Sequence, residues 1–313
     1  MTKKLLSFVI PAYNEEECVD LLYDALAALF NQLSAYDCEA IIVENGSHDT
    51  TYEKLLAIRA RDPRFKILKL ARNFMTDGGM TAGLHYASGD AAIMLSADLE
   101  DPLATILEFV KKWEEGYQNV YGVIRRRQGT WLRRFNSKMF YAVINKLTGG
   151  VIPRYVSDFR LIDRKVIDTV NGMNERTRML RGIMAWTGFK TCGVVFDRGD
   201  RVAGLSKAHT MHVLKVAFRG IVAFSVVPLR LAIVLGLLLT AGSALTIGVM
   251  GFKALFLGHV WSDLSIILSF VSFMFGILFI LIGILSEYVG MAFEEVKARP
   301  NFIVEQAVGF DGN

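Results

Sequence analysis

The chain has 313 residues, of which 52% are hydrophobic, and a formal net charge of +4. This length accommodates one ordinary α/β domain and a further, more apolar part. The three cysteines, Cys18, Cys38 and Cys192, lack the spacing of metal ligands and are odd in number, which argues against a zinc site and a disulfide framework. We expect reduced thiols in a cytosolic domain, and no nucleic-acid partner.

Residues 5 to 110 alternate between short apolar runs and amphipathic stretches. The pattern predicts strands at 6–11, 40–43, 65–70 and 91–95 and helices at 16–33, 50–60 and 78–87. Such alternation is typical of a parallel sheet covered on both faces by helices. The chain lacks G-x-G-x-x-G and G-x-x-x-x-G-K-[ST], which counts against a dinucleotide dehydrogenase and a P-loop NTPase.

The fourth predicted strand ends in carboxylates. Asp98, Glu100 and Asp101 follow it within a few residues, and clustered hard oxygen ligands suit Mg²⁺ or Mn²⁺, which usually keep phosphate as a further ligand. Asp101 also precedes Pro102 and an amphipathic helix expected at 103–115, so we assign it to the helix N-cap. Capping leaves Asp98 unexplained, and we expect Asp98 to hold a metal bound to a diphosphate.

Polar loops follow three of the predicted strands, at residues 11–15, 44–49 and 96–98. Ligands of open α/β sheets bind beyond the carboxyl ends of the strands, so these loops should converge. They would form a nucleotide-diphosphate pocket in which Tyr13 stacks on the base. Each loop is a weak signal alone, because Tyr13 could belong to the core and residues 45–47 could be only a turn.

The second half of the chain is expected to continue the domain and then enter a membrane. We predict a strand at 120–124, a basic helix at 131–147 and short strands and turns over 153–205, which completes a domain of residues 1–205. An amphipathic interfacial helix would follow at 206–226, because cationic and apolar residues are interleaved there.

Two long runs without charge, 231–252 and 264–286, predict a pair of transmembrane helices within residues 227–290. A buried helical hairpin in a soluble protein is the alternative. Basic residues flank the pair on its outer sides, which predicts a multi-pass inner- or plasma-membrane protein. The catalytic domain, both termini and a tail at 291–313 would then be cytoplasmic.

Several motifs recur in a familiar order. They are P-x-Y-N-E from Pro11, the turn Glu44-Asn45-Gly46-Ser47-His48-Asp49, L-x-R-N-F from Leu70, A-D-L-x-D-P from Ala97, Ser157-Asp158-Phe159-Arg160, the run from Glu175 to Gly182, and Arg201-Val202-Ala203-Gly204-Leu205-Ser206-Lys207. With the two expected spans, the chain resembles the family 2 glycosyltransferases that act on polyisoprenyl phosphates. These include dolichyl-phosphate mannose synthases and bacterial undecaprenyl-phosphate glucosyltransferases. The resemblance covers essentially the whole chain, and the ordered set is specific although no single motif is.

The resemblance implies a GT-A fold, Rossmann-like with a mostly parallel sheet. It implies an inverting, Mg²⁺- or Mn²⁺-dependent transfer of a hexose from a nucleotide-diphosphate sugar to polyprenyl phosphate at the cytoplasmic membrane face. UDP-glucose or UDP-N-acetylhexosamine is the expected donor, and the lipid-linked sugar would serve cell-surface glycan modification.

The resemblance also implies a set of site residues. The catalytic ones are Asp98, Asp158 and Arg160, and the metal ligands are Asp98 and Glu100. The nucleotide-sugar site would comprise Pro11, Tyr13, Asn14, Glu15, Glu44, Asn45, Ser47, Arg72 and Ala97. The acceptor phosphate would meet Arg125, Arg133, Ser137, Arg201, Ser206 and Lys207.

Elementary electrostatics supports this division of roles. A lipid phosphate is already largely dianionic near neutrality, so it needs cations to hold it rather than a base to deprotonate it. The basic residues could instead only touch anionic headgroups. Asp158 could bind a sugar hydroxyl, orient an arginine or act as a base, and we favour a positioning role.

Five residues depart from the pattern of these relatives. Ser96 and Glu44-Asn45 stand where aspartates are usual, Met75 where glycine is usual, and Ile124 where arginine is usual. The loss of one carboxylate at Ser96 keeps a non-catalytic nucleotide-sugar-binding protein open as an alternative.

A processive family 2 polysaccharide synthase is a further alternative. The missing Q-x-x-R-W signature and the provision of only two spans argue against it. A homo-oligomer packed through Gly236, Gly248 and Gly276 also stays open.

Overall fold

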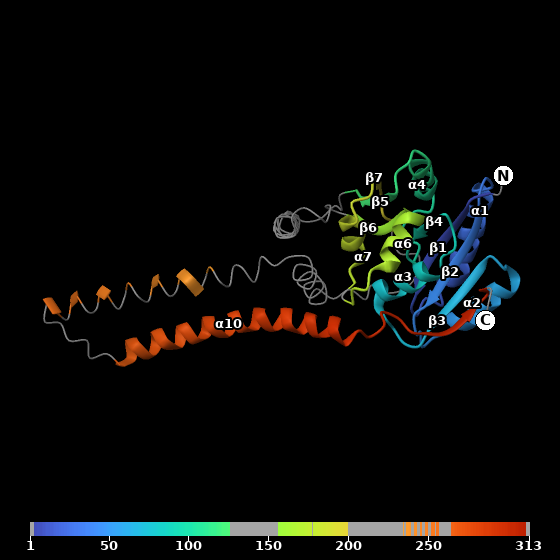
Figure 1. The fold of residues 1–313 in the computed structure, drawn as a ribbon. Helices are drawn as coiled ribbons and strands as arrows, with labels where there is room; N and C mark the ends of the chain where they lie inside the picture. The colour runs from blue at the N-terminus through green and yellow to red at the C-terminus, as the bar shows by residue number, and fades with distance from the viewer. Residues whose placement is uncertain are drawn as a thin grey trace. The chain divides into compact units, whose positions relative to one another are not determined.

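The computed structural model describes residues 3–125, 156–176, 178–199 and 264–310, together with scattered positions between 234 and 256 (Figure 1). The predicted basic helix at 131–147 and the predicted interfacial helix at 206–226 lie outside these residues. The chain forms two compact units, one of residues 1–210 with 298–313 and one of residues 211–297.

The described residues of the first unit form a mixed, mostly parallel sheet of eight strands in the order β7-β5-β6-β4-β1-β2-β3-β8. Only β6 and β8 run antiparallel to their neighbours. The strands are β1 (Leu5–Ala12), β2 (Asp37–Glu44), β3 (Phe65–Leu70), β4 (Ala91–Met94), β5 (Asn119–Ile124), β6 (Val156–Asp163), β7 (Thr191–Phe196) and β8 (Val304–Val308). The five strands predicted between residues 6 and 124 are confirmed.

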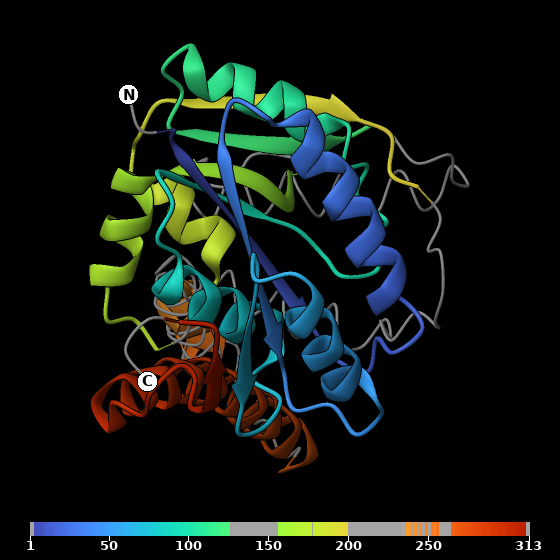
Figure 2. The ribbon, with the colours of Figure 1, turned by 90° about the vertical axis from the view of Figure 1, so that its right-hand side faces the viewer.

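Helices cover both faces of the sheet (Figure 2). They are α1 (Val19–Gln32), α2 (Thr51–Arg61), α3 (Met75–Tyr86), α4 (Thr105–Glu114), α6 (Arg164–Gly172) and α7 (Leu180–Trp186). The first four match the predicted helices. The prediction of only short strands and turns over 153–205 is wrong, because α6 and α7 lie there. Helix α6 carries its own start signal, since the side chain of Asp163 accepts a hydrogen bond from the Lys165 N–H.

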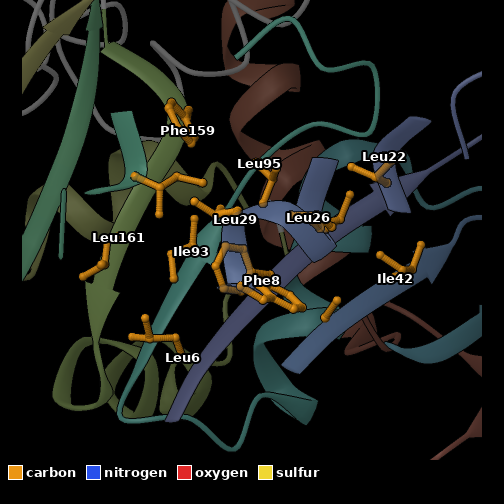
Figure 3. Packing of buried hydrophobic residues seen from close by; sticks show 14 of the residues in the cluster. Leu6, Phe8, Leu22, Leu26, Leu29, Ile42, Ile93, Leu95, Phe159 and Leu161 are labelled. Carbon is orange, nitrogen blue, oxygen red and sulfur yellow. The ribbon is translucent and has the colours of Figure 1, made fainter. Parts of the chain in front are cut away.

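The main core lies between the sheet and the helices α1, α2 and α4. Leu6, Phe8 and Ile10 alternate along β1 and are fully buried there, with the Phe8 ring 4.9 Å from that of Phe30 on α1 (Figure 3). Val9, which lies between Phe8 and Ile10 in the sequence, faces α3 on the other side of the sheet. Burial on both faces is what a central parallel strand requires, and it fixes the register of β1 and its neighbours.

Asp101 does not cap α4, so that prediction is wrong. The helix begins at Thr105, and the backbone N–H groups of Thr105 and Ile106 donate to the carbonyls of Pro102 and Leu103, each at 3.0 Å. A short turn therefore satisfies the first N–H groups of the helix in place of a side-chain cap. Asp101 is 3% exposed and pairs with an arginine described below.

The second unit contains α10 (Leu264–Lys297), which continues beyond the predicted end of the second span. Within its residues Phe273–Lys297, an 18-residue window has a mean hydropathy of 2.1, so by length and composition this helix could cross a membrane. It is the single such candidate in the part of the chain that the structure describes. The predicted two-helix hairpin is not confirmed, because most of residues 231–252 lie outside that part.

The predicted cytoplasmic tail contributes a strand that the sequence analysis missed. Strand β8 pairs antiparallel with β3. Its Gln306 side chain accepts a hydrogen bond from the Tyr52 hydroxyl at 2.7 Å, and Glu305 forms a 2.9 Å ion pair with Lys69. Phe310 packs against Tyr86, with ring centroids 5.1 Å apart. The end of the chain therefore belongs to the same domain as its beginning.

Candidate functional site

The sheet topology brings the candidate site residues to one edge. Strands β1 to β4 are parallel, so the loops after them leave the sheet on the same side. Strand β6 runs the other way and pairs Arg160 with Met94 of β4. The start of β6, with Asp158, therefore lies beside the end of β4 that leads to Asp98. Residues 60 positions apart in the sequence are thus brought together.

The loops after β1 and β2 are joined by hydrogen bonds. The Asn14 N–H donates to the Ser47 hydroxyl at 3.0 Å, and the His48 N–H donates to the Asn14 side-chain oxygen at 2.9 Å. The Ser47 N–H donates to the carboxylate of Glu44, which is 1% exposed. Asn14, Glu44 and Ser47 are therefore brought together as predicted, and their polar groups shape the two loops.

Asn45 ties the loop after β2 to the loop after β3. Its side-chain oxygen accepts from the Phe74 N–H and its amide donates to the Met75 carbonyl, both at 2.9 Å. The residue is 3% exposed. An aspartate here could accept the first bond but could not donate the second. This gives a structural reason for the departure from aspartate, and indicates that Asn45 acts on the loops.

Gly46 makes a very close approach to the loop after β3. Its φ is +73°, and a Cβ placed on it would lie 2.7 Å from the Arg72 carbonyl carbon and 2.8 Å from the Asn73 nitrogen. Both are backbone atoms, so the neighbour cannot yield by rotating a side chain. The turn is therefore a fixed connection between the two loops.

We expect Gly46→Ala to lower the free energy of unfolding by about 3 kcal/mol, because backbone strain and a backbone clash add. Gly188→Ala is the matched control. Its φ is +72°, but nothing lies within 4 Å of the added methyl group, so only strain of about 1 kcal/mol is expected. Thermal unfolding of both variants measures the difference, and equal losses would contradict the close approach.

The remaining predicted nucleotide contacts differ in exposure. Pro11, Tyr13 and Glu15 are half-buried, Ala97 is buried, and Arg72 is exposed with its guanidinium 4.1 Å from the centre of the Phe74 ring. Tyr13 is not part of the buried core. Its ring lies edge-on to His48, with the centroids 6.4 Å apart. Tyr13 therefore lies at the sheet edge, where a planar ligand could reach it.

The acidic loop, residues 98–101, has a strained backbone. Leu99 has a φ of +54°, and the Glu100 N–H donates to Asp98 Oδ1 at 3.3 Å. Asp98 is 6% exposed. Burial raises the pKa of Asp101 to about 6, although the nearby Arg198 acts to lower it. A non-glycine residue in this conformation persists only where its surroundings hold it.

The residues of the acidic loop fit a metal ion whose remaining coordination positions are filled by phosphate oxygens of a bound ligand. In the described ranges, no group of three or more His, Cys, Asp or Glu side chains could hold a metal ion. Mg²⁺ usually takes one or two carboxylates from the protein and completes its shell with phosphate oxygens and water. Asp98 and Glu100 can supply such carboxylates. The buried Asp101 Oδ1 also lacks a hydrogen-bond partner among the described residues, although the Arg198 guanidinium lies 3.5 Å away.

Asp158 lies in a charged cluster. Its Oδ2 is 2.7 Å from Nη2 of Arg181 on α7, an ion pair whose side chains are about one-third exposed. Arg160 is 2% exposed and donates to the Ser157 carbonyl at 2.9 Å. Burial lowers the pKa of Arg160 to about 10, which still leaves it cationic near neutrality. Two arginines therefore surround the carboxylate at the start of β6.

Asp77 on α3 joins this cluster, and the sequence analysis missed it. Its Oδ1 accepts a hydrogen bond from the Leu180 N–H at 3.3 Å. Burial, followed by the negative charge of Asp158, raises the pKa of Asp77 to about 6. The sequence gives no signal for this contact, because 103 positions separate the two partners.

We expect Asp77→Asn to stabilise the protein above pH 6, by at most about 3 kcal/mol. The folded-state pKa of Asp77 exceeds the unfolded value of about 3.8, so the folded protein binds the extra proton and loses stability as the pH rises from about 4 to 6. Asparagine removes that loss and keeps an acceptor for Leu180. Thermal unfolding between pH 4 and 8 measures the gap, which should open with rising pH; a constant gap would refute the shift.

Of the predicted acceptor-phosphate residues, only Arg125 lies within the described residues. It is exposed, and its Nη1 is 3.0 Å from Oδ2 of Asp197, which follows β7. Arg133, Ser137, Arg201, Ser206 and Lys207 lie outside the described residues. The structure adds Arg198, which pairs with Glu100 and Asp101. The sequence analysis did not single out this residue.

Comparisons of the sequence with known proteins identify a family. The model of the family described as "Glycosyl transferase family 2" matches residues 7–170. An uncharacterized glycosyltransferase of Synechocystis sp. is 38% identical over 98% of this chain and 96% of its own length. An SfII prophage-derived bactoprenol glucosyl transferase of Shigella flexneri is 34% identical over 96% of this chain and 98% of its own length.

Among solved structures, glucosyl-3-phosphoglycerate synthase from Mycobacterium tuberculosis in complex with Mn²⁺ and UDP-glucose is similar, with a TM-score of 0.44 and 18% identity. The match covers 70% of this chain and 77% of that one.

Proposed function

The chain belongs to glycosyl transferase family 2, and from this premise we propose that it transfers a hexose from a nucleoside diphosphate sugar to polyprenyl phosphate. The observation that carries the proposal is the convergence of Asp98, Asp158 and the loops after β1 and β2 at one sheet edge, in a chain with a helix able to cross a membrane. The name of the Shigella relative supports a lipid acceptor and a glucosyl donor.

The donor would lie across the acidic loop and the loops after β1 and β2. Tyr13 would stack on the base, and the groups around Glu15 and Ser47 would bind the nucleoside. Asp98, assisted by Glu100, would hold a Mg²⁺ or Mn²⁺ ion on the diphosphate. Such an ion would neutralise charge on the departing nucleoside diphosphate. Arg72 lies exposed after β3 and can contribute a further cation.

The acceptor would attack without a general base. A phosphate monoester with a second pKa of about 6 is mostly dianionic at neutral pH, so one of its oxygens is already a nucleophile. That oxygen would form a bond to the anomeric carbon as the bond to the diphosphate breaks, with inversion. The nucleoside diphosphate leaves as the anion. Arg125, Arg133, Ser137, Arg201, Ser206 and Lys207 would hold the acceptor phosphate.

Asp158 would position the sugar. Its carboxylate lies 2.7 Å from the Arg181 guanidinium and can accept a hydrogen bond from a sugar hydroxyl. Arg160, fixed by its bond to the Ser157 carbonyl, holds positive charge behind that carboxylate. Orientation and preorganised charge, rather than proton abstraction, would then supply the rate enhancement.

The reaction would take place at the cytoplasmic face of a bacterial inner or plasma membrane. Hydrocarbon chains of polyprenyl phosphate remain in the lipid, so the catalytic unit must work at the membrane surface. We propose two membrane spans, with both termini and the catalytic domain in the cytoplasm. The apolar α10, a candidate span, supports the membrane assignment.

The test is transfer by the purified full-length protein. A panel of nucleotide sugars, led by UDP-glucose and UDP-N-acetylglucosamine, is incubated with undecaprenyl phosphate, and the lipid product is identified by mass. We expect a product of lipid plus one hexose residue, which requires both lipid and a divalent metal. Nucleotide binding without lipid-dependent transfer by any donor would overturn the proposal and favour a non-catalytic binding protein.

A further inference from the structure

Arg198 bridges the end of β7 and the acidic loop. Its Nε is 3.0 Å from Glu100 Oε2 and 3.5 Å from Asp101 Oδ1. The next residue adds a backbone link, because the Gly199 N–H donates to the Glu100 carbonyl at 2.9 Å. The Arg198 side chain therefore contacts Glu100 and Asp101, and a main-chain group of the same short segment contacts Glu100 as well.

These contacts are shielded from solvent. The side chain of Arg198 is 25% exposed, that of Glu100 16% and that of Asp101 3%. An ion pair of this kind is screened far less than a surface pair. Removal of its cation would leave two neighbouring carboxylates, one of them buried, without their nearest positive charge, which is strongly unfavourable.

The segment that carries Arg198 is itself fixed. Strand β7 pairs in register with β5 up to Phe196, whose carbonyl accepts from the Arg125 N–H at 2.8 Å. Arg198 follows the end of β7 by two residues, so its guanidinium is carried by a segment that is anchored at the sheet. On the other side of the contact, the left-handed backbone at Leu99 is a strained conformation that neighbouring contacts must hold.

We propose that Arg198 is a positioning residue: it clamps Glu100 and Asp101 so that the acidic loop presents Asp98 to the metal-bound diphosphate of the donor. This inference rests on the proposed function. It gives Glu100 a second role, since one of its carboxylate oxygens is engaged by the clamp. It also makes the geometry of the donor site depend on Arg198, which lies three residues before Arg201, a residue proposed to hold the acceptor phosphate.

The experiment measures binding of UDP in the presence of Mn²⁺ to the full-length protein by calorimetry, with sugar transfer followed in parallel. Partners that orient a metal ligand typically account for 10- to 100-fold in affinity. We expect Arg198→Gln to weaken binding by about 10-fold or more, and Arg198→Lys to restore part of the loss, because it keeps the charge.

A purely electrostatic role for Arg198 predicts the opposite change in the affinity for UDP and Mn²⁺. If Arg198 only lowered the negative potential of the loop, its removal would tighten the binding of Mn²⁺ and UDP. Unchanged or tighter binding by Arg198→Gln would therefore overturn the inference. Arg61→Gln is the matched control, because Arg61 is 58% exposed and pairs with Asp20 at 3.9 Å on the surface. It should bind as the unaltered protein does.

A double-mutant cycle separates the clamp from a general loss of structure. Asp101→Asn removes the more buried of the two carboxylates that pair with Arg198, so in the double variant with Arg198→Gln only the Glu100 charge is left without its partner and part of the affinity should return. Strict additivity of the two changes would overturn the clamp.

If the unaltered protein transfers sugar while Arg198→Gln binds normally, only this inference fails. If the unaltered protein neither binds UDP nor transfers sugar, the proposed function fails and this inference with it.

Discussion

Asp98→Ala should lower sugar transfer at saturating donor by at least about 10²-fold, because it removes the carboxylate proposed to hold the metal on the diphosphate. The loop backbone would also lose an internal bond, since Asp98 Oδ1 accepts from the Glu100 N–H. The concentration of Mn²⁺ needed for half-maximal UDP binding should rise in parallel. The measurement is initial rate and calorimetric binding over a Mn²⁺ series.

The matched control is Asp24→Ala. Asp24 is an exposed carboxylate on α1, away from the sheet edge that carries the loops. It should leave both rate and Mn²⁺ dependence unchanged. Full activity of Asp98→Ala at ordinary Mn²⁺ concentrations would show that the metal assignment is wrong.

Asp158→Asn should reduce kcat by about 10²-fold with a much smaller change in KM for the nucleotide sugar. Asparagine keeps the size of the side chain but loses the charge that pairs with Arg181, so the sugar would be bound yet poorly oriented. Steady-state kinetics with donor and lipid varied separately measures the two constants.

Asp168→Asn provides the control for this change. Asp168 is a 63% exposed carboxylate on α6 that pairs with Arg164 one helical turn away, so its loss should have little effect. An increase confined to KM for the nucleotide sugar would contradict positioning of the reacting sugar by Asp158, and would assign it to ground-state binding alone.

The first 125 residues could be predicted well from the sequence because their signals are local. Strands β1 to β4 are buried on both faces and appear as short apolar runs, and the helices between them carry clear amphipathic periodicity. Strand β8 could not be predicted in this way. Its five residues are half exposed, and its place is set by β3, which lies more than 230 positions earlier.

The residues of the candidate site also divide into those that the sequence indicates and those that it does not. Asp98 and the polar loops after β1 and β2 could be singled out because each follows a predicted strand at an edge that topology makes meaningful, whereas Asp158 was expected only from the resemblance to a family. The partners that fix them, Arg181 and Arg198, could not be identified. Ion pairs between distant segments depend on three-dimensional placement, and single basic residues are common on any surface.

One departure from the relatives has a conformational explanation. Met75 has a φ of +62°, a left-handed conformation that glycine adopts freely and that costs a side-chain-bearing residue about 1–2 kcal/mol. The carbonyl of this residue accepts the bond from Asn45. The methionine is therefore held in a conformation that its own preferences oppose and that a glycine would adopt without this cost.

The attachment of β8 to β3 has a consequence for biosynthesis. A ribosome makes β3 early and β8 near the very end, with residues 211–297 emerging between them. Until the last strand arrives, the outer edge of β3 keeps unpaired backbone groups that could recruit another chain. Completion of the sheet must therefore wait until the apolar segment has been synthesised, so an assembly factor or rapid delivery to the translocon would protect the nascent enzyme.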